Sequence, residues 1–201
     1  MIKVGITGGI GSGKSTICTL FSLLGIPVYN SDIRAKELMI SDFFVVNALK
    51  KTFGKEIYLS EGVLNKQLLL KLVFESSSAR QTINDIVHPA VWRDFDDWTH
   101  SYSSISTYVI QESALLFETG NNAKMDAIIT VTCPLNERIE RIMHRDNCTF
   151  EDATNKINSQ IPEQEKAEKS DFVIESSQNN LVIENVLNIH NTLIKNIKNE
   201  N

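Results

Sequence analysis

The segment GITGGIGSGKST, residues 5–16, constrains the fold of this chain more than any other feature of its sequence. It contains the pattern G-x-x-x-x-G-K-[ST] at residues 8–15, after an apolar run and before apolar residues at helical spacing. Glycines at such a strand-to-helix turn let successive backbone N–H groups point at an anion, and the helix start adds partial positive charge. A glycine-rich turn without a ligand is the alternative, but the spacing and the context together favour a phosphate-binding loop.

The loop residues have distinct expected roles at a bound nucleoside triphosphate. Lys14 is expected to reach the β- and γ-phosphates and so to act in catalysis, and the Ser15 hydroxyl is expected to ligate Mg²⁺, the predicted metal cofactor. The residues predicted to bind ATP are Gly11, Ser12, Gly13, Lys14, Ser15 and Thr16.

Five short β-like runs recur along the chain, with helical patterns between them. They lie at residues 2–7, 26–30, 106–112, 126–132 and 171–175. Near-continuous apolar strands joined by helices are typical of a parallel sheet that is covered on both faces. The sequence therefore predicts an α/β fold with a five-stranded parallel sheet, whose ligands bind at the carboxyl ends of the strands.

Two stretches interrupt this alternation and predict insertions into a nucleotide-binding core. Residues 41–100 are mostly helical in pattern and predict a helical subdomain, whereas residues 135–168 predict a second helical insertion placed as a lid. Within the second insertion, Thr149 to Asp152 match a helix-start pattern. The core then comprises about 1–40, 101–134 and 169–201, in a single domain of 201 residues.

Composition and charge exclude several classes of function. The formal net charge is −5 and no lysine or arginine run occurs, so nucleic acid is not expected as a partner. Three cysteines without CxxC or CxxH spacing support neither a disulfide framework nor a zinc site. No apolar stretch approaches the ~20 residues of a membrane span, and no export signal is evident, so a cytoplasmic protein is expected.

Asp32 and three arginines are further candidates for catalysis. Asp32 follows the second β-like run, where its carboxylate could accept a proton from an attacking hydroxyl or could equally cap a helix. Arg138, Arg141 and Arg145 share one helix face, which could be solvated or could close over the phosphates. The run 106–112 ends in Glu112 rather than aspartate, and no NKxD motif is present, which favours a small kinase over a GTPase or a motor ATPase.

The ordered motifs resemble those of the dephospho-CoA kinase family over the whole chain. The matching segments are GITGGIGSGKST at 5–16, NSD at 30–32, FG at 53–54, INDIVHP at 83–89, ALLFETG at 114–120, RIMHRDN at 141–147, KINSQIPEQEK at 156–166 and SDFVI at 170–174. The resemblance implies ATP-dependent phosphorylation of the 3′-hydroxyl of dephospho-CoA, the last step of coenzyme A synthesis. It also implies a P-loop kinase core with a helical CoA domain and a lid.

Carried over residue by residue, the resemblance implies catalytic roles for Asp32, Lys14, Arg141 and Arg145. Asp32 and His88 would bind the acceptor, although His88 beside Pro89 could instead mark the end of one helix and the start of the next. Arg138 has no counterpart in the family pattern. The chain departs from that pattern at Asn30 and Ser31, where the family has D-A, at Lys156, where arginine is usual, and at Arg93, which lies one position late.

Two other functions stay open at this point. A different P-loop kinase, acting on a nucleoside or a nucleotide, would share the phosphate loop and the lid. A regulatory domain that binds nucleotide without turning it over would share the loop alone. Acceptor screening separates the first from a dephospho-CoA kinase, and the absence of turnover on any acceptor would identify the second.

Overall fold

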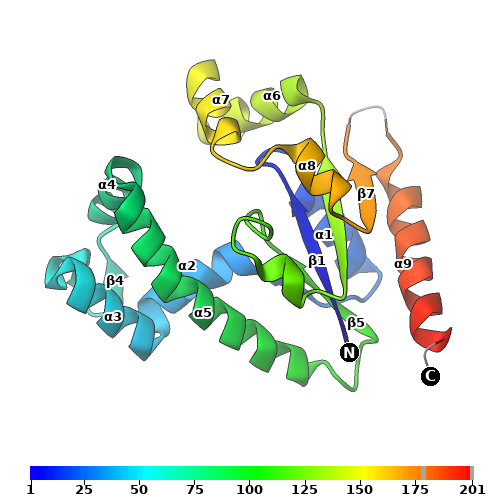
Figure 1. Ribbon diagram of the computed structural model, residues 1–201, viewed down its shortest axis with the longest axis horizontal. Coiled ribbons are helices and arrows are strands. Elements are labelled where there is room, and N and C mark those ends of the chain that lie inside the picture. Colours follow the sequence, from blue (N-terminus) through cyan, green and yellow to red (C-terminus); the bar gives the residue numbers. More distant parts are fainter. Residues whose placement is uncertain (178–179, 200–201) are drawn as a thin grey trace. The chain divides into compact units, whose positions relative to one another are not determined.

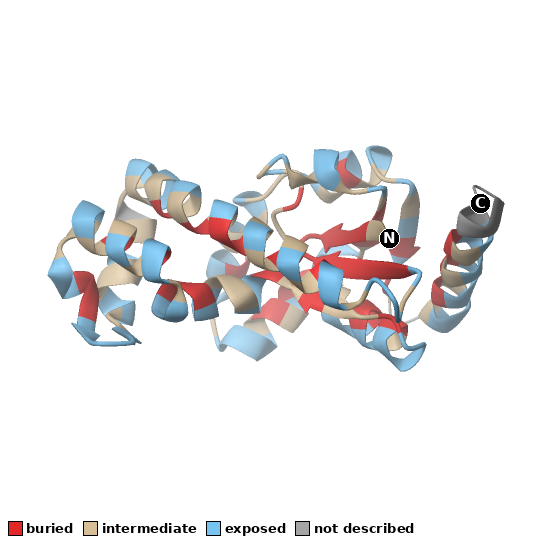
Figure 2. Ribbon diagram, turned by 90° about the horizontal axis from the view of Figure 1, so that it is seen from below, coloured by how far each residue is buried: buried red, intermediate tan, exposed pale blue. Residues whose placement is uncertain are grey.

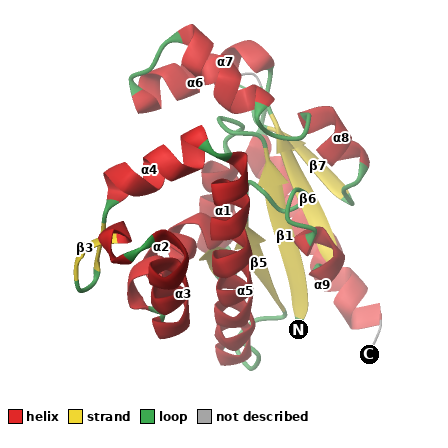
Figure 3. Ribbon diagram, turned by 60° about the vertical axis from the view of Figure 1, so that its left-hand side comes forward, coloured by secondary structure: helices red, strands yellow, loops and turns green. Residues whose placement is uncertain are grey.

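Five strands pair in parallel to form the sheet, in the order β2-β5-β1-β6-β7. Their bounds are β1 (Ile2–Gly8), β2 (Val28–Asn30), β5 (Tyr108–Glu112), β6 (Ala127–Thr132) and β7 (Phe172–Glu175). Figure 3 draws β1, β6 and β7 side by side, and Figure 2 shows the strands mostly buried. The five-stranded parallel sheet predicted from the β-like runs is confirmed, with each strand within two residues of its expected bounds.

The structure is a computed structural model that describes residues 1–177 and 180–199, except the side chains of residues 74, 75 and 196–199. Its contacts divide the chain into two compact units. The first comprises Met1–Asn30 and Ser101–Asn201 and holds the sheet, and the second comprises Ser31–His100. The functional roles predicted for the insertion at 41–100 and for the lid stay predictions.

Helices cover both faces of the sheet within the first unit. They are α1 (Lys14–Leu23) and α9 (Val182–Asn199) on one face and α8 (Glu163–Glu168) on the other, with a short 3₁₀ turn at Asn121–Lys124. Two further helices, α6 (Leu135–Asp146) and α7 (Phe150–Asn158), pack on each other beyond the end of the strands (Figure 1). On β6, Ile129 and Val131 join the apolar core with α1 and α9. Thr130 lies between them and faces α8, and its hydroxyl hydrogen bonds to that of Ser170, which follows the end of this helix, at 2.6 Å.

The second unit is helical except for one small hairpin. Its elements are α2 (Ser31–Ser41), α3 (Phe43–Phe53), a 3₁₀ turn (Lys55–Ile57), β3 (Tyr58–Ser60), β4 (Val63–Leu64), α4 (Lys66–Glu75) and α5 (Ser77–Ser101). The antiparallel β3–β4 pair was not predicted, because strands of three and two residues are too short to show a period. Arg34 on α2 forms a bidentate ion pair with Asp94 on α5: its Nε donates to Oδ2 at 2.9 Å and its Nη2 to Oδ1 at 2.6 Å.

Helix α5 continues through Pro89, so the interpretation of His88 and Pro89 as a helix boundary is wrong. A proline within a helix removes one backbone donor, and packing can outweigh that loss. Here the buried side of α5 runs unbroken past the proline, from Ile83 and Val87 to Val91. The tertiary contacts of this side stabilise the helix across a position where its local sequence favours an end.

Two expectations based on composition can be checked directly. All three cysteines lie in the described part of the chain, and each is a free thiol. Among the described residues, no helix combines the length and the apolar character that crossing a membrane requires.

Candidate active site

The glycine-rich loop joins the end of β1 to the start of α1. Gly13 precedes α1 with φ 91°, a left-handed conformation that side chains rarely adopt, and a Cβ there would lie 2.6 Å from the Ser176 hydroxyl. A Cβ on Gly8 would overlap the carbonyl oxygen of Val131 on the neighbouring strand. The glycines at both ends of the loop are therefore required by the fold of the loop, as the pattern predicts.

Lys14, Ser12 and Ser15 lie where the loop leads into α1. The Lys14 Nζ donates hydrogen bonds to the carbonyl oxygens of Gly8 and Gly9, both at 3.0 Å, so its ammonium group lies over the loop. Ser15 is exposed in the first turn of α1. The Ser12 hydroxyl is buried and has no hydrogen-bond partner among the described residues, which is typical of a loop whose partner is a ligand.

Glu112 ends β5 directly beside Asn30, the last residue of β2. The Asn30 side-chain amide donates to Glu112 Oε2 at 2.7 Å. An amide therefore stands where the family pattern has an aspartate, and it donates to a carboxylate that a second carboxylate would repel. Burial, together with the Glu112 carboxylate, raises the pKa of the neighbouring Cys18 thiol, so Cys18 stays protonated at neutral pH.

Arg141 contacts the phosphate loop from the lid. Its Nη1 donates to the Gly11 carbonyl oxygen at 3.3 Å, and its Nη2 donates to the Ser176 carbonyl oxygen at 2.9 Å and to Glu137 at 3.1 Å. One guanidinium thus joins the loop, the residue after β7 and its own helix. The structure brings Arg141 together with the loop that contains Lys14, and its catalytic role stays a prediction.

Arg145 has different partners, although it shares a helix face with Arg141. Its Nε donates to Asp146 Oδ1 at 2.7 Å, and Lys156 of α7 donates to Asp146 Oδ2 at 2.6 Å. These hydrogen bonds hold the pKa of Asp146 well below its usual range. Lys156, which replaces the usual arginine, therefore joins α7 to α6 through Asp146. The structure does not bring Arg145 to the loop, and its catalytic role stays a prediction.

Arg138 is buried against the loop, at 6% exposure, and so does not belong to a solvated face. Its Nε donates to the Ile10 carbonyl oxygen at 3.0 Å. Gln160 and Glu163, which the sequence interpretation did not single out, also bind the loop: Gln160 accepts from the Ile10 N–H at 2.8 Å, and Glu163 from the Gly9 N–H at 3.4 Å. Their place in the family segment KINSQIPEQEK was the only signal that could have indicated them.

Asp32 and His88 lie together in the second unit. Asp32 is exposed in the first turn of α2. The negative charges of Asp85 and Asp32 both act to raise the pKa of His88. Burial outweighs both carboxylates and lowers the pKa of His88. Because α2 begins at Ser31, Asp32 lies inside the helix and is not its N-cap residue.

The remaining departure from the family pattern, Arg93, makes one weak contact. Its Nη2 lies 3.7 Å from Asp42 Oδ2, and its side chain is 58% exposed. Exposed ion pairs of this length contribute little to stability. Nothing in the structure assigns Arg93 a role.

Comparison with known proteins supports one family. A family model described as dephospho-CoA kinase matches residues 2–181. A dephospho-CoA kinase from Bacteroides fragilis is 40% identical over 173 residues, covering 86% of this chain and 83% of the relative. A crystal structure of a Thermus thermophilus protein matches with a TM-score of 0.83 and 30% identity, over 95% of this chain and 96% of that one.

The fold is also that of a solved dephospho-CoA kinase. The enzyme from Campylobacter jejuni aligns with a TM-score of 0.71 at 22% identity, over 96% of this chain and 98% of that one. A family match over nearly the whole chain, together with a relative at 40% identity, leaves no other P-loop kinase family favoured. The chain belongs to the dephospho-CoA kinase family.

Proposed function

We propose that this protein transfers the γ-phosphoryl group of ATP to the 3′-hydroxyl of dephospho-CoA and releases coenzyme A and ADP. This reaction is the last step of coenzyme A synthesis. The observation that carries the proposal is a phosphate loop with Lys14 lying over it and Arg141 bonded to it from the lid, in a chain of this family. The cytoplasm is the location that we propose, from the sequence.

On the donor side, positive charge would stabilise the phosphoryl group as it transfers. Lys14 would exchange its hydrogen bonds with the Gly8 and Gly9 carbonyl oxygens for oxygens of the β- and γ-phosphates. The residues proposed to hold the phosphates are those of the loop and first turn, Gly11 to Thr16. Arg141, already bonded to the loop, would act on the charge of the transferring group, and Arg145 is proposed for the same role on the family resemblance alone.

Magnesium is the metal that we propose to accompany ATP. The exposed Ser15 hydroxyl is a hard oxygen donor that suits Mg²⁺, a cation that usually keeps waters and phosphate oxygens as its other ligands. Bound there, the ion would neutralise charge on the phosphates. Ser15 is the residue of this chain proposed to hold it.

On the acceptor side, Asp32 would serve as the general base. Its carboxylate is exposed in the first turn of α2 and would take the proton of the attacking hydroxyl. His88, whose pKa is lowered, would be neutral at pH 7 and could bind the acceptor as a hydrogen-bonding group without charge. Binding of the remote parts of a long acceptor would help to orient its hydroxyl.

An acceptor panel tests the proposal. ADP release is measured with dephospho-CoA, AMP and adenosine at matched concentrations, and the product is checked for a 3′-phosphate. We expect dephospho-CoA to be phosphorylated far better than the other two, in turnover as well as in apparent affinity. His88→Ala should narrow this difference, whereas His100→Ala, an exposed position on the same helix, should not.

Equal rates with AMP or adenosine would contradict the proposal and favour a nucleoside or nucleotide kinase. ATP binding without turnover on any acceptor would favour a regulatory domain instead.

A further inference from the structure

Side chains from both ends of the predicted lid bond the phosphate loop at Gly9 and Ile10, which we call its outer side. Arg138 lies in the first turn of α6, with 7% of its side chain exposed, and donates to the Ile10 carbonyl oxygen at 3.0 Å. Gln160, just before α8, accepts from the Ile10 N–H at 2.8 Å. Both polar groups of the Ile10 backbone are thus bonded to lid side chains.

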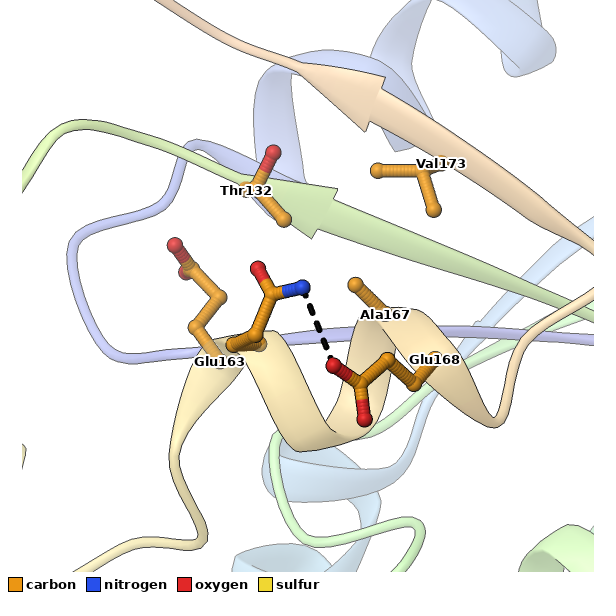
Figure 4. A pocket seen from close by; sticks show the side chains of 6 residues that line it. Thr132, Glu163, Ala167, Glu168 and Val173 are labelled. Atoms are coloured by element: carbon orange, nitrogen blue, oxygen red, sulfur yellow. Dashed lines mark hydrogen bonds between the residues drawn. The ribbon is translucent and has the colours of Figure 1, made fainter.

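Glu163 completes this set of contacts. Its Oε1 accepts from the Gly9 N–H at 3.4 Å and lies 3.5 Å from Arg138 Nη1, and its Oε2 accepts from the Cys133 N–H at 3.0 Å. Figure 4 shows its side chain extending from α8 toward the end of β6 at Thr132. Only 13% of this side chain is exposed, so the carboxylate and the guanidinium form a largely desolvated pair behind the loop.

Glycine is needed at position 9 because the Arg138 guanidinium lies close to it, and not because the backbone there has a conformation that favours glycine. Unlike Gly8, Gly11 and Gly13, it does not have a positive φ. A Cβ built on Gly9 meets the Arg138 guanidinium, whose carbon would lie only 2.6 Å away. The absence of a side chain at position 9 therefore makes room for Arg138.

We propose that Arg138 and Glu163 are positioning residues that hold the phosphate loop in its nucleotide-binding form before nucleotide arrives. A loop held in this way loses less conformational freedom on binding, so the phosphates bind more tightly. The two side chains bond Gly9 and Ile10 and none of the residues from Gly11 to Thr16, which are proposed to hold the phosphates. The proposal rests on the proposed function only in that the loop binds ATP.

Equilibrium binding of ATP·Mg²⁺, measured by calorimetry without acceptor, tests this role. Arg138→Ala and Glu163→Gln should each raise the Kd by about tenfold, the effect of losing one charged hydrogen bond. The KM for dephospho-CoA should change little in the same variants. Glu140→Gln on α6 and Glu165→Gln on α8, both exposed, are the matched controls and should leave the Kd unchanged.

A double-variant cycle tests the contact itself. Gly9→Ala should weaken ATP binding about as much as Arg138→Ala, because the added methyl group displaces the guanidinium. The combined variant should then bind ATP no more weakly than either single variant. Losses that add up would overturn the claim that Gly9 acts through Arg138.

Variants that only destabilise the fold can be recognised. If Arg138→Ala does not fold, Arg138→Lys retains the charge beside Glu163 and should give a smaller rise in Kd at unchanged melting temperature. Wild-type ATP affinity in folded Arg138→Ala and Glu163→Gln would overturn the proposal. Because binding is measured without acceptor, a failure of dephospho-CoA as substrate would leave this result unaffected.

Discussion

The phosphate loop and the Asp32–His88 pair are held in different ways. The loop is fixed by hydrogen bonds from lid side chains, of which Arg138 is buried, and Lys14 is bonded to it at two carbonyl oxygens. Asp32 is exposed, and His88 is half-buried beside two carboxylates. The difference indicates that the loop, proposed to bind the donor, is preformed, whereas Asp32, proposed to act on the acceptor, is exposed to solvent.

The comparison predicts the largest effect at Lys14. Lys14→Ala should abolish turnover, because no other residue of the loop can place a point charge between the β- and γ-phosphates. ADP release with dephospho-CoA measures this, with exposed Lys169→Ala as the control. A near-normal rate would show that the loop is not the phosphate site.

Asp32→Asn should lower turnover by roughly 10²-fold or more, because the amide cannot accept the hydroxyl proton. ATP affinity and melting temperature should stay near wild type, since the carboxylate is exposed and Asp32 is not the N-cap residue of α2. Turnover, the Kd for ATP and a thermal melt are measured on the same sample. A lower melting temperature without a specific loss of rate would return Asp32 to a structural role.

The loss of turnover on substituting a lid arginine should be larger for Arg141, which contacts the loop, than for Arg145, which does not. Arg141→Ala should lower turnover by roughly 10²-fold, because its guanidinium bonds the loop, whereas Arg145→Ala should cost about tenfold, because it bonds Asp146. Both should change turnover more than ATP affinity. Steady-state kinetics over a range of ATP concentrations decides this, with Glu140→Gln as the control.

Arg138 cannot serve as a neutral control on this helix, because it bonds the loop itself. The reverse order, with Arg145 more damaging than Arg141, would mean that the lid rearranges before transfer.

The smallest expected effect is a pH dependence of stability at His88. Its folded-state pKa lies below the ordinary value of 6.5, so the unfolded chain takes up the proton first as the pH falls. The free energy of unfolding should therefore fall as the pH drops below about 6.5, and His88→Gln should remove part of that fall. Denaturant titrations at pH 7.5 and 5.5 measure the free energy of unfolding of the wild type and of His88→Gln. An equal fall between the two pH values in both proteins would show that His88 is not responsible.

Much of the fold could be predicted because its signals are local. Each strand is a continuous apolar run, α1 follows the loop directly, and the capping box at Thr149 and Asp152 starts α7 as its pattern indicates. The β3–β4 hairpin and the passage of α5 through Pro89 were not predictable, because they depend on packing in the second unit. Nor does the sequence show that, on α6, Leu135 is exposed whereas Arg138 is buried.

The sequence by itself determined the phosphate loop, the five-stranded parallel sheet and the family, because these depend on short patterns of glycine, charge and apolar residues. Only the tertiary structure decided which lid residues hold the loop. Arg138, Gln160 and Glu163 bond to Ile10 and Gly9 across 128, 150 and 154 positions of sequence. The spacing of three arginines places them on one helix face, but it cannot tell which lies against a distant loop, because that depends on how the helix packs.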